Sequence, residues 1–170
     1  MNYKEKLNHI NTFIFDIDGV LTDGTVTLFP DGEQVRKMST RDGYAMQYAL
    51  KKGYRIAIIS GGSSKGVQKR FDYLGLTDVH LGCSNKMGVF TELVQTYNLN
   101  TEHILYMGDD LPDLEVMKKV GLPTCPQNAA TEIKQMAEYV SPKNGGDGCV
   151  RDVIEQTLRV QRKWVNEQES

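Results

Sequence analysis

Five aspartates stand shortly after two apolar runs of the sequence, and their type and spacing suit them to chemistry. Carboxylates that converge on one point repel each other, and a divalent cation bound among them relieves the repulsion. A carboxylate can also attack phosphorus as a nucleophile, while a second one passes a proton to the leaving group and takes one from water. These residues predict metal-assisted phosphoryl chemistry, with a loop or helix-capping role as the alternative for single members. The five are Asp16, Asp18, Asp109, Asp110 and Asp113.

Two further positions have the chemistry to hold a phosphate. Ser60-Gly61-Gly62 offers a hydroxyl and backbone N–H groups, although a plain turn explains the same residues. Lys86 opens a predicted helix, where the helix dipole disfavours a cation. This unfavourable placement indicates a partner such as a phosphate or the nucleophile, and a solvated surface lysine is the alternative.

The candidate residues follow apolar runs that predict buried β-strands at 12–15, 55–59 and 103–107, with shorter strands at 79–81 and 139–140. Amphipathic helical patterns separate these runs. The alternation predicts an α/β fold, a doubly wound parallel sheet with helices on both faces. Because ligands bind at the carboxyl ends of the strands in such sheets, we expect the candidate side chains to meet there.

Five helical patterns supply the covering layers, each with its apolar residues spaced along one face. Glycines at 53, 75 and 121 end three of them. The apolar positions are Tyr44, Tyr48 and Ala49; Val67, Phe71 and Leu74; Met87, Phe90, Leu93, Val94 and Tyr97; Leu114, Met117 and Val120; and Val150, Ile154 and Leu158.

The segment 24–39 departs from this alternation. Pro30-Asp31-Gly32 separates two strand-like runs, which predicts a β-hairpin inserted after the first strand. A two-stranded ribbon alone is only marginally stable in water. We therefore expect this hairpin to pack against another subunit.

Length and charge limit the function classes. The 170 residues predict one domain over 1–170, with a C-terminal tail over 144–170. The 20 basic and 22 acidic residues leave no basic excess, so no nucleic-acid partner is expected. No apolar run reaches the roughly 18 residues of a membrane span, so no membrane partner is expected either. The N-terminus lacks the apolar core of a signal peptide.

The cysteines and histidines add no metal centre. Cys83, Cys125 and Cys149 are odd in number and far apart, which indicates reduced thiols in a cytoplasmic protein. The three histidines fit no ligand spacing, and structural roles explain them better.

Four motifs in order, Asp16-x-Asp18-Gly19, Ser60, Lys86 and Gly108-Asp109-Asp110-x-x-Asp113, resemble those of the haloacid dehalogenase (HAD) superfamily of phosphatases. The resemblance implies that Asp16 is the nucleophile and Asp18 the general acid/base. Ser60 and Lys86 would hold the phosphate. Mg²⁺ would bind Asp16, the Asp18 carbonyl and Asp109, with Asp110 and Asp113 as outer or weaker ligands.

The short spacing between these motifs indicates a capless member, in which a neighbouring subunit or a macromolecular substrate shields the site. Segments 18–24, 41–44 and 145–151 are similar to the family of 3-deoxy-D-manno-octulosonate 8-phosphate (KDO 8-phosphate) phosphatases. This resemblance implies a homotetramer assembled through the hairpin, a sugar-phosphate substrate and a role in lipopolysaccharide precursor synthesis. The residues that it places around the substrate are Asp18, Ser39, Thr40, Arg41, Asp42, Gly43, Gly61, Arg70, Lys86 and Arg151.

The sequence leaves three alternatives to a KDO 8-phosphate phosphatase. A related phosphatase acts on the nine-carbon 2-keto-3-deoxynononate 9-phosphate, but the run Arg41-Asp42-Gly43-Tyr44 and the glycine at 62 favour the eight-carbon sugar. Several family members carry arginines where this chain has Gln47 and Gly62, so two cations are missing here. A phosphomutase would need a cap, and a non-catalytic phosphosugar-binding module would be expected to lack Asp16 or Asp18.

Overall fold

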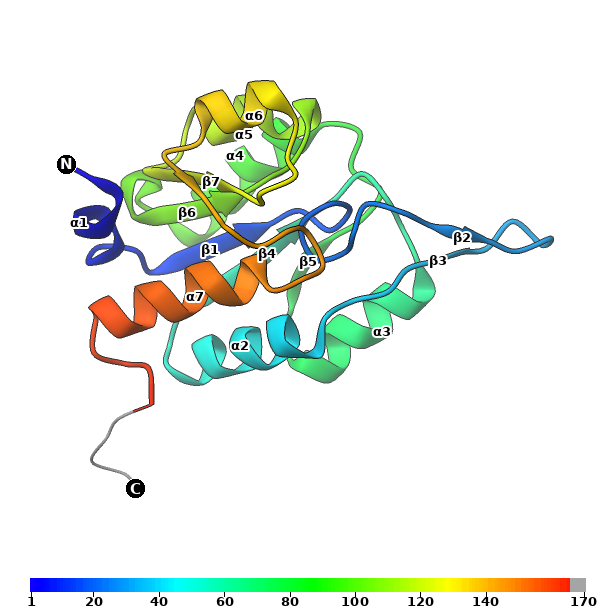
Figure 1. The fold of residues 1–170 in the computed structure, drawn as a ribbon, viewed down its shortest axis with the longest axis horizontal. Coiled ribbons are helices and arrows are strands. Elements are labelled where there is room, and N and C mark those ends of the chain that lie inside the picture. The colour runs from blue at the N-terminus through cyan, green and yellow to red at the C-terminus, as the bar shows by residue number, and fades with distance from the viewer. Residues whose placement is uncertain (166–170) are drawn as a thin grey trace.

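A parallel six-stranded sheet forms the centre of the computed structural model, which describes residues 1–165 (Figure 1). The strand order is β5-β4-β1-β6-β7-β8, and all of its neighbouring strands run parallel. The predicted α/β doubly wound class is therefore confirmed. The strands are β1 (Thr12–Phe15), β4 (Arg55–Ile59), β5 (Asp78–His80), β6 (Ile104–Met107), β7 (Leu122–Cys125) and β8 (Tyr139–Val140).

Helices cover both faces of this sheet. One face carries α2, α3 and α7, and the other carries α4, α5 and α6 (Figure 1). Within residues 1–165, no helix has the length and apolar content needed to cross a membrane. The helices are α1 (Tyr3–Leu7), α2 (Thr40–Lys51), α3 (Lys65–Leu74), α4 (Lys86–Tyr97), α5 (Leu114–Met117), α6 (Thr131–Met136) and α7 (Cys149–Val160), with short 3₁₀ turns at Thr101–His103 and Leu111–Asp113.

The central strands are buried on both sides, which explains their continuous apolar sequences. In β1, Phe13 and Phe15 pack into the α2/α3/α7 side while Ile14 packs into the other. Successive side chains of a strand point to opposite faces, so both layers draw on one short run. In β6 the same alternation sends Tyr106 toward the α4/α5 side.

Some elements differ from the sequence predictions. Strand β7 was not predicted, because Pro123 stands inside its four residues and reads as a turn signal. In α2, Tyr44 was expected on the buried face but its side chain is exposed. Ala49 is buried as predicted, and Ala45 and Met46 join it on that face, where α2 packs closely on α7.

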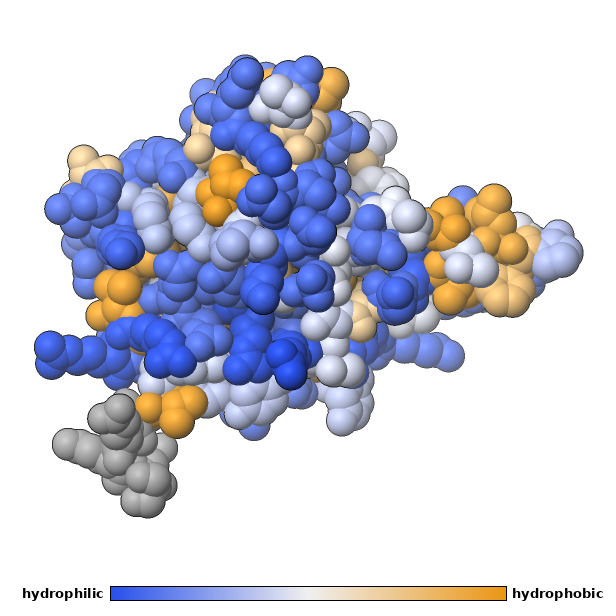
Figure 2. Space-filling view, viewed as in Figure 1, coloured by the Kyte–Doolittle hydropathy of each residue, from blue (hydrophilic) through white to orange (hydrophobic). Residues whose placement is uncertain are grey.

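The predicted hairpin is present as β2 (Thr27–Leu28) and β3 (Gln34–Val35), an antiparallel pair that projects from the body (Figure 1). Its projecting part exposes apolar side chains, seen as the orange surface in Figure 2. Only this hairpin and α2 separate β1 from β4, and only α3 and β5 lie between β4 and α4. The exposed apolar residues of the hairpin are Val26, Leu28, Phe29 and Val35.

Candidate active site

The carboxyl ends of β1, β4 and β6 meet at one edge of the sheet because these parallel strands end at nearly the same position in the register. Phe15, the last residue of β1, pairs with Ile58 of β4 and Met107 of β6. The residues that follow each strand therefore reach the same place, a cleft of about 580 Å³. Its lining includes Asp16, Asp18, Ser60, Gly61, Lys86, Asp109, Asp110 and Asp113.

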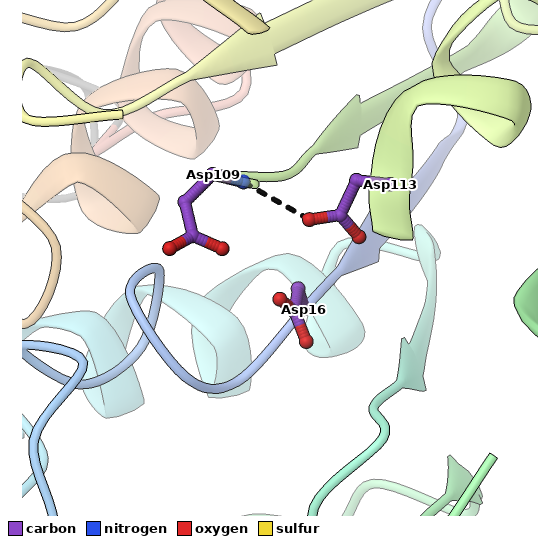
Figure 3. Close-up of side chains that lie close together, drawn as sticks. All are labelled: Asp16, Asp109 and Asp113. Carbon is purple, nitrogen blue, oxygen red and sulfur yellow. Dashed lines mark hydrogen bonds between the residues drawn. The ribbon is translucent and has the colours of Figure 1, made fainter. Parts of the chain in front are cut away.

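Three carboxylates come together in this cleft. Oxygens of Asp16, Asp109 and Asp113 lie within 4.8 Å of one another, and the Asp109 backbone N–H donates to Asp113 Oδ2 at 3.0 Å (Figure 3). Burial and the negative charge of Asp113 raise the pKa of Asp16, and the same two causes raise the pKa of Asp109 to about 6. The crowded carboxylates therefore favour a bound cation, and their hard oxygen donors fit Mg²⁺.

A tight turn after β1 brings the backbone close to Asp109. Gly19 has φ +85°, and a Cβ at this position would overlap Asp109 Oδ2. Only glycine allows both the left-handed backbone and the close approach. The Asp16-x-Asp18-Gly19 motif thus has a structural requirement as well as a chemical one.

Lys86 lies inside the carboxylate cluster. Its Nζ is 3.1 Å from Asp16 Oδ1 and 2.8 Å from Asp113 Oδ1, and its side chain is 8% exposed. Although burial opposes it, the charges of these two carboxylates raise the pKa of Lys86, which keeps the ammonium charged. The alternative of a solvated surface lysine is therefore wrong.

Tyr106 of β6 is a site residue that sequence reasoning missed. Its hydroxyl donates to Asp113 Oδ1 at 2.6 Å, and the side chain is fully buried. Asp113 Oδ1 thus accepts hydrogen bonds from both Tyr106 and Lys86, while Oδ2 accepts one from the backbone N–H of Asp109. A polar tip inside the apolar run 103–107 was the only available signal, since a buried tyrosine hydroxyl needs a partner.

Arg36 is the second missed residue. It follows β3 at the base of the hairpin and forms a two-pronged ion pair with Asp18. Charged residues on an exposed hairpin are common, so nothing in the local sequence distinguishes Arg36.

The remaining cleft residues have simple local roles. Ser60 is buried, and its Oγ accepts the Gly62 N–H at 3.3 Å. Asp110 accepts a hydrogen bond from the Leu111 N–H at 2.8 Å and caps the 3₁₀ turn 111–113. For this aspartate the predicted helix-capping role therefore applies.

The segment 39–43, Arg70 and Arg151, which were expected around the sugar, do not line the cleft that holds the carboxylate cluster. Thr40 and Arg70 line a groove of about 290 Å³, and Arg41 and Arg151 line another of about 410 Å³. Ser39 caps α2, with its Oγ accepting the Asp42 N–H at 3.4 Å, and Gly43 is buried against Arg70.

Asp42 was also expected to border the sugar. In this chain its side chain is fully buried between α2 and α7. Its Oδ1 accepts a backbone N–H from α7, so it serves the packing of these helices.

Comparison with known proteins identifies this arrangement. Residues 82–153 match the family of haloacid dehalogenase-like hydrolases. The KDO 8-phosphate phosphatase of Escherichia coli K12 is 38% identical over 158 residues, covering 93% of this chain and 84% of that protein.

Solved structures agree with this match. The KDO 8-phosphate phosphatase of Yersinia pestis has a TM-score of 0.91 at 34% identity, covering 94% of this chain and 86% of the other. The enzyme from Moraxella catarrhalis, solved with magnesium, phosphate and KDO, has a TM-score of 0.91 at 31% identity, covering 95% and 92%.

The fold and the site define a haloacid dehalogenase-like hydrolase. Within that class, the chain belongs to the family of KDO 8-phosphate phosphatases, as its sequence resemblance predicted.

Proposed function

We propose that this protein hydrolyses KDO 8-phosphate to KDO and inorganic phosphate in a Mg²⁺-dependent reaction, within lipopolysaccharide precursor synthesis. The observation that carries this proposal is that Asp16 contacts Lys86 and lies with the carboxylates of Asp109 and Asp113 in one cleft. The related Moraxella enzyme binds magnesium, phosphate and KDO, which supports the same substrate here.

Asp16 is the nucleophile in this mechanism. The Ile17 N–H at 2.7 Å and Lys86 at 3.1 Å both hold Asp16 Oδ1, which fixes the orientation of the carboxylate. A carboxylate oxygen attacks phosphorus, and the bond between phosphorus and the sugar oxygen breaks. The product on the protein is an aspartyl-phosphate at Asp16.

Asp18 handles the protons in both halves of the reaction. It gives a proton to the departing sugar oxygen and then takes one from the water that attacks the aspartyl-phosphate. Phosphate leaves, and the Asp16 carboxylate is restored.

The other cleft groups bind and neutralise charge. Lys86, the Ser60 hydroxyl and the Gly61 N–H, all from residues that line the cleft, would hold the phosphate oxygens. Asp16, Asp109 and the Asp18 carbonyl would hold Mg²⁺, while Asp113 orients Lys86 and the Asp109 backbone. When bound, the cation offsets the charges of the phosphate and the carboxylates.

Neighbouring subunits complete the sugar site in this proposal. The exposed apolar side chains of the hairpin support its use as an interface, and we propose a homotetramer built through it. Arg41 and Arg70 would then meet the substrate carboxylate from outside the cleft of one chain, a role that suits a guanidinium. Arg151 would close over the site with the Gly145-Gly146 tail.

The chain acts as one catalytic domain over 1–170, in which the hairpin 24–39 serves assembly. The tail 144–170 includes residues outside the described range, but its glycine segment packs on the loop after β1, where the Gly146 N–H donates to the Val20 carbonyl at 3.0 Å. All three cysteines are free thiols, which supports a cytoplasmic location.

The decisive experiment compares kcat/KM with Mg²⁺ for KDO 8-phosphate, the nine-carbon 9-phosphate and an aryl phosphate. We expect a preference of about 100-fold for the first, or about 2.7 kcal/mol of transition-state free energy. Equal and slow rates on all three would reject the sugar assignment and keep the chemistry. A preference for the nine-carbon substrate would select the alternative enzyme.

A further inference from the structure

A two-pronged ion pair joins the hairpin to the proton-transfer residue. Arg36 Nε lies 2.6 Å from Asp18 Oδ1, and Arg36 Nη2 lies 3.1 Å from Asp18 Oδ2. Both residues are partly buried. Parallel N–H···O bonds of this kind fix the carboxylate in orientation as well as in position. The side chain of Asp18 is therefore held from outside the loop that carries it.

The loop after β4 leaves space for this pair. A Cβ at Gly62 would lie 2.9 Å from Arg36 Nη2 and 2.9 Å from Asp18 Oδ2. A side chain at this position would therefore press on both partners at their contact. The glycine at 62 thus leaves room for the guanidinium beside Asp18.

Asp18 stands apart from the carboxylates that gather in the cleft. Although it lies two residues from Asp16, the cluster found within residues 1–165 contains Asp16, Asp109 and Asp113. A free carboxylate beside a divalent cation site is itself a good ligand. A carboxylate bound to the cation would be turned toward the metal and away from the reacting oxygens, so it could not carry the proton. Arg36 holds the Asp18 oxygens instead.

We propose that Arg36 is a positioning residue that keeps the Asp18 carboxylate off the Mg²⁺ and available for proton transfer. The inference rests on the proposed phosphatase mechanism. Arg36 occupies both oxygens of Asp18 and so competes with the cation for them. The hairpin thus supplies a working part of the site within the same chain, in addition to its proposed role in assembly.

The test measures Mg²⁺ binding and turnover separately. Arg36→Met keeps an unbranched apolar stem and removes the charged guanidinium. Calorimetric titration of the protein with MgCl₂, without substrate, should show several-fold tighter binding, because Asp18 becomes an added ligand. On an aryl phosphate, kcat should fall about 10- to 100-fold with little change in KM, as is usual when a residue that orients a reacting group is lost.

Two further single variants are measured beside Arg36→Met. Arg36→Lys should restore part of kcat, since it returns the charge without the fork. Lys37→Met, an exposed cation on the next residue, should match the parent protein in both measurements. If Arg36→Met does not fold, Gly62→Ala separates the same pair by steric pressure and should give the same two effects.

The double variant Asp18→Asn/Arg36→Met shows whether the effect passes through Asp18. It should bind Mg²⁺ as Asp18→Asn alone does. Mg²⁺ binding in Arg36→Met that is unchanged or weaker, tighter binding that persists without the Asp18 carboxylate, or a change in KM alone would overturn the proposal. Failure of the KDO 8-phosphate assignment would leave the Mg²⁺ titration and the aryl phosphate assay intact, so the two failures are distinguishable.

Discussion

Asp42 Oδ1 accepts a hydrogen bond of 2.9 Å from the backbone N–H of Arg151. Arg151 is the third residue of α7, and Gly148 before that helix has no side chain to cap it. The carboxylate of α2 thus caps the N-terminus of α7 from a distant part of the chain. The two helices that meet at this contact lie side by side across one face of the sheet (Figure 1).

This contact predicts a pH-dependent stability. Burial raises the pKa of Asp42 from 3.8 to about 6, and its Oδ2 has no hydrogen-bond partner among the described residues. The native protein then holds the proton more tightly than the unfolded chain, so ionisation of Asp42 opposes folding. The cost is absent below about pH 4, grows up to about pH 6 and is complete above it, where it reaches about 3 kcal/mol.

Asp42→Asn removes this ionisation and keeps an acceptor for the Arg151 N–H. Urea unfolding of both proteins between pH 4 and pH 7 measures the effect. The stability of the variant relative to the parent should rise by about 3 kcal/mol from about pH 4 to about pH 6.5. A difference that stays constant across this range would show that Asp42 ionises normally.

Replacing the nucleophile should separate chemistry from binding. Asp16→Asn removes the attacking oxygen and keeps the size of the side chain, so kcat should fall by about 10⁴-fold or more. Mg²⁺-dependent phosphate binding should survive in part, because Lys86 and Ser60 remain. Steady-state kinetics and calorimetry with phosphate measure the two properties. Undiminished turnover would remove Asp16 from the nucleophile role.

The turn at Gly19 should be intolerant of any side chain. Gly19→Ala places a Cβ on the Asp109 carboxylate, so we expect Mg²⁺ binding to be lost. Gly75→Ala is the matched control, because Gly75 has φ +86° and no atom of residues 1–165 lies within 4 Å of its Cβ position. It should cost about 1–2 kcal/mol of stability from backbone strain alone. Equal Mg²⁺ affinities in the two variants would contradict the steric argument.

The hydroxyl of Tyr106 should matter to catalysis. Tyr106→Phe leaves Asp113 Oδ1 with Lys86 as its side-chain partner, so the orientation of both groups loosens. Activity or apparent Mg²⁺ affinity should fall about 10- to 100-fold, as for other residues that orient metal ligands. Tyr97→Phe removes a similar tyrosine–aspartate bond, to Asp78, outside the cleft and should leave the Mg²⁺ activation curve unchanged.

The hairpin should control assembly. Leu28 is 71% exposed, and Leu28→Asp places a charge on the proposed interface. Light scattering at micromolar concentration should give a tetramer for the parent protein and a smaller species for the variant, with lower activity on the sugar phosphate. A monomeric parent protein would reject the shared site.

The strands were the most predictable part of the fold. The runs 12–15, 55–59 and 103–107 are short, apolar and followed by polar residues, and the structure places β1, β4 and β6 there within one residue. Buried central strands need apolar residues on both faces, so their sequences are distinctive. The positions of Asp16, Ser60 and Asp109 at one edge followed from that pattern.

The missed features depend on tertiary contacts. Tyr106 and Asp113 are only 7 residues apart and Arg36 and Asp18 only 18, but the two members of each pair stand on different elements or loops, and no local pattern marks such pairs. The role of Asp42 was missed for the same reason, because its partner Arg151 lies at the other end of the chain. Local periodicity reports which face of an element is buried and leaves the pairing of polar groups open.

The register of β1 and β6, in which Phe15 pairs with Met107, links cation binding to correct strand pairing during folding. Side chains alternate along a strand, so a shift of one residue between β1 and β6 would send their side chains to opposite faces and separate Asp16 from Asp109. A misregistered chain would therefore have no cluster for Mg²⁺. Because a ligand stabilises only the state that binds it, the cation would enrich the correctly paired chain during refolding and discriminate against its slipped competitors.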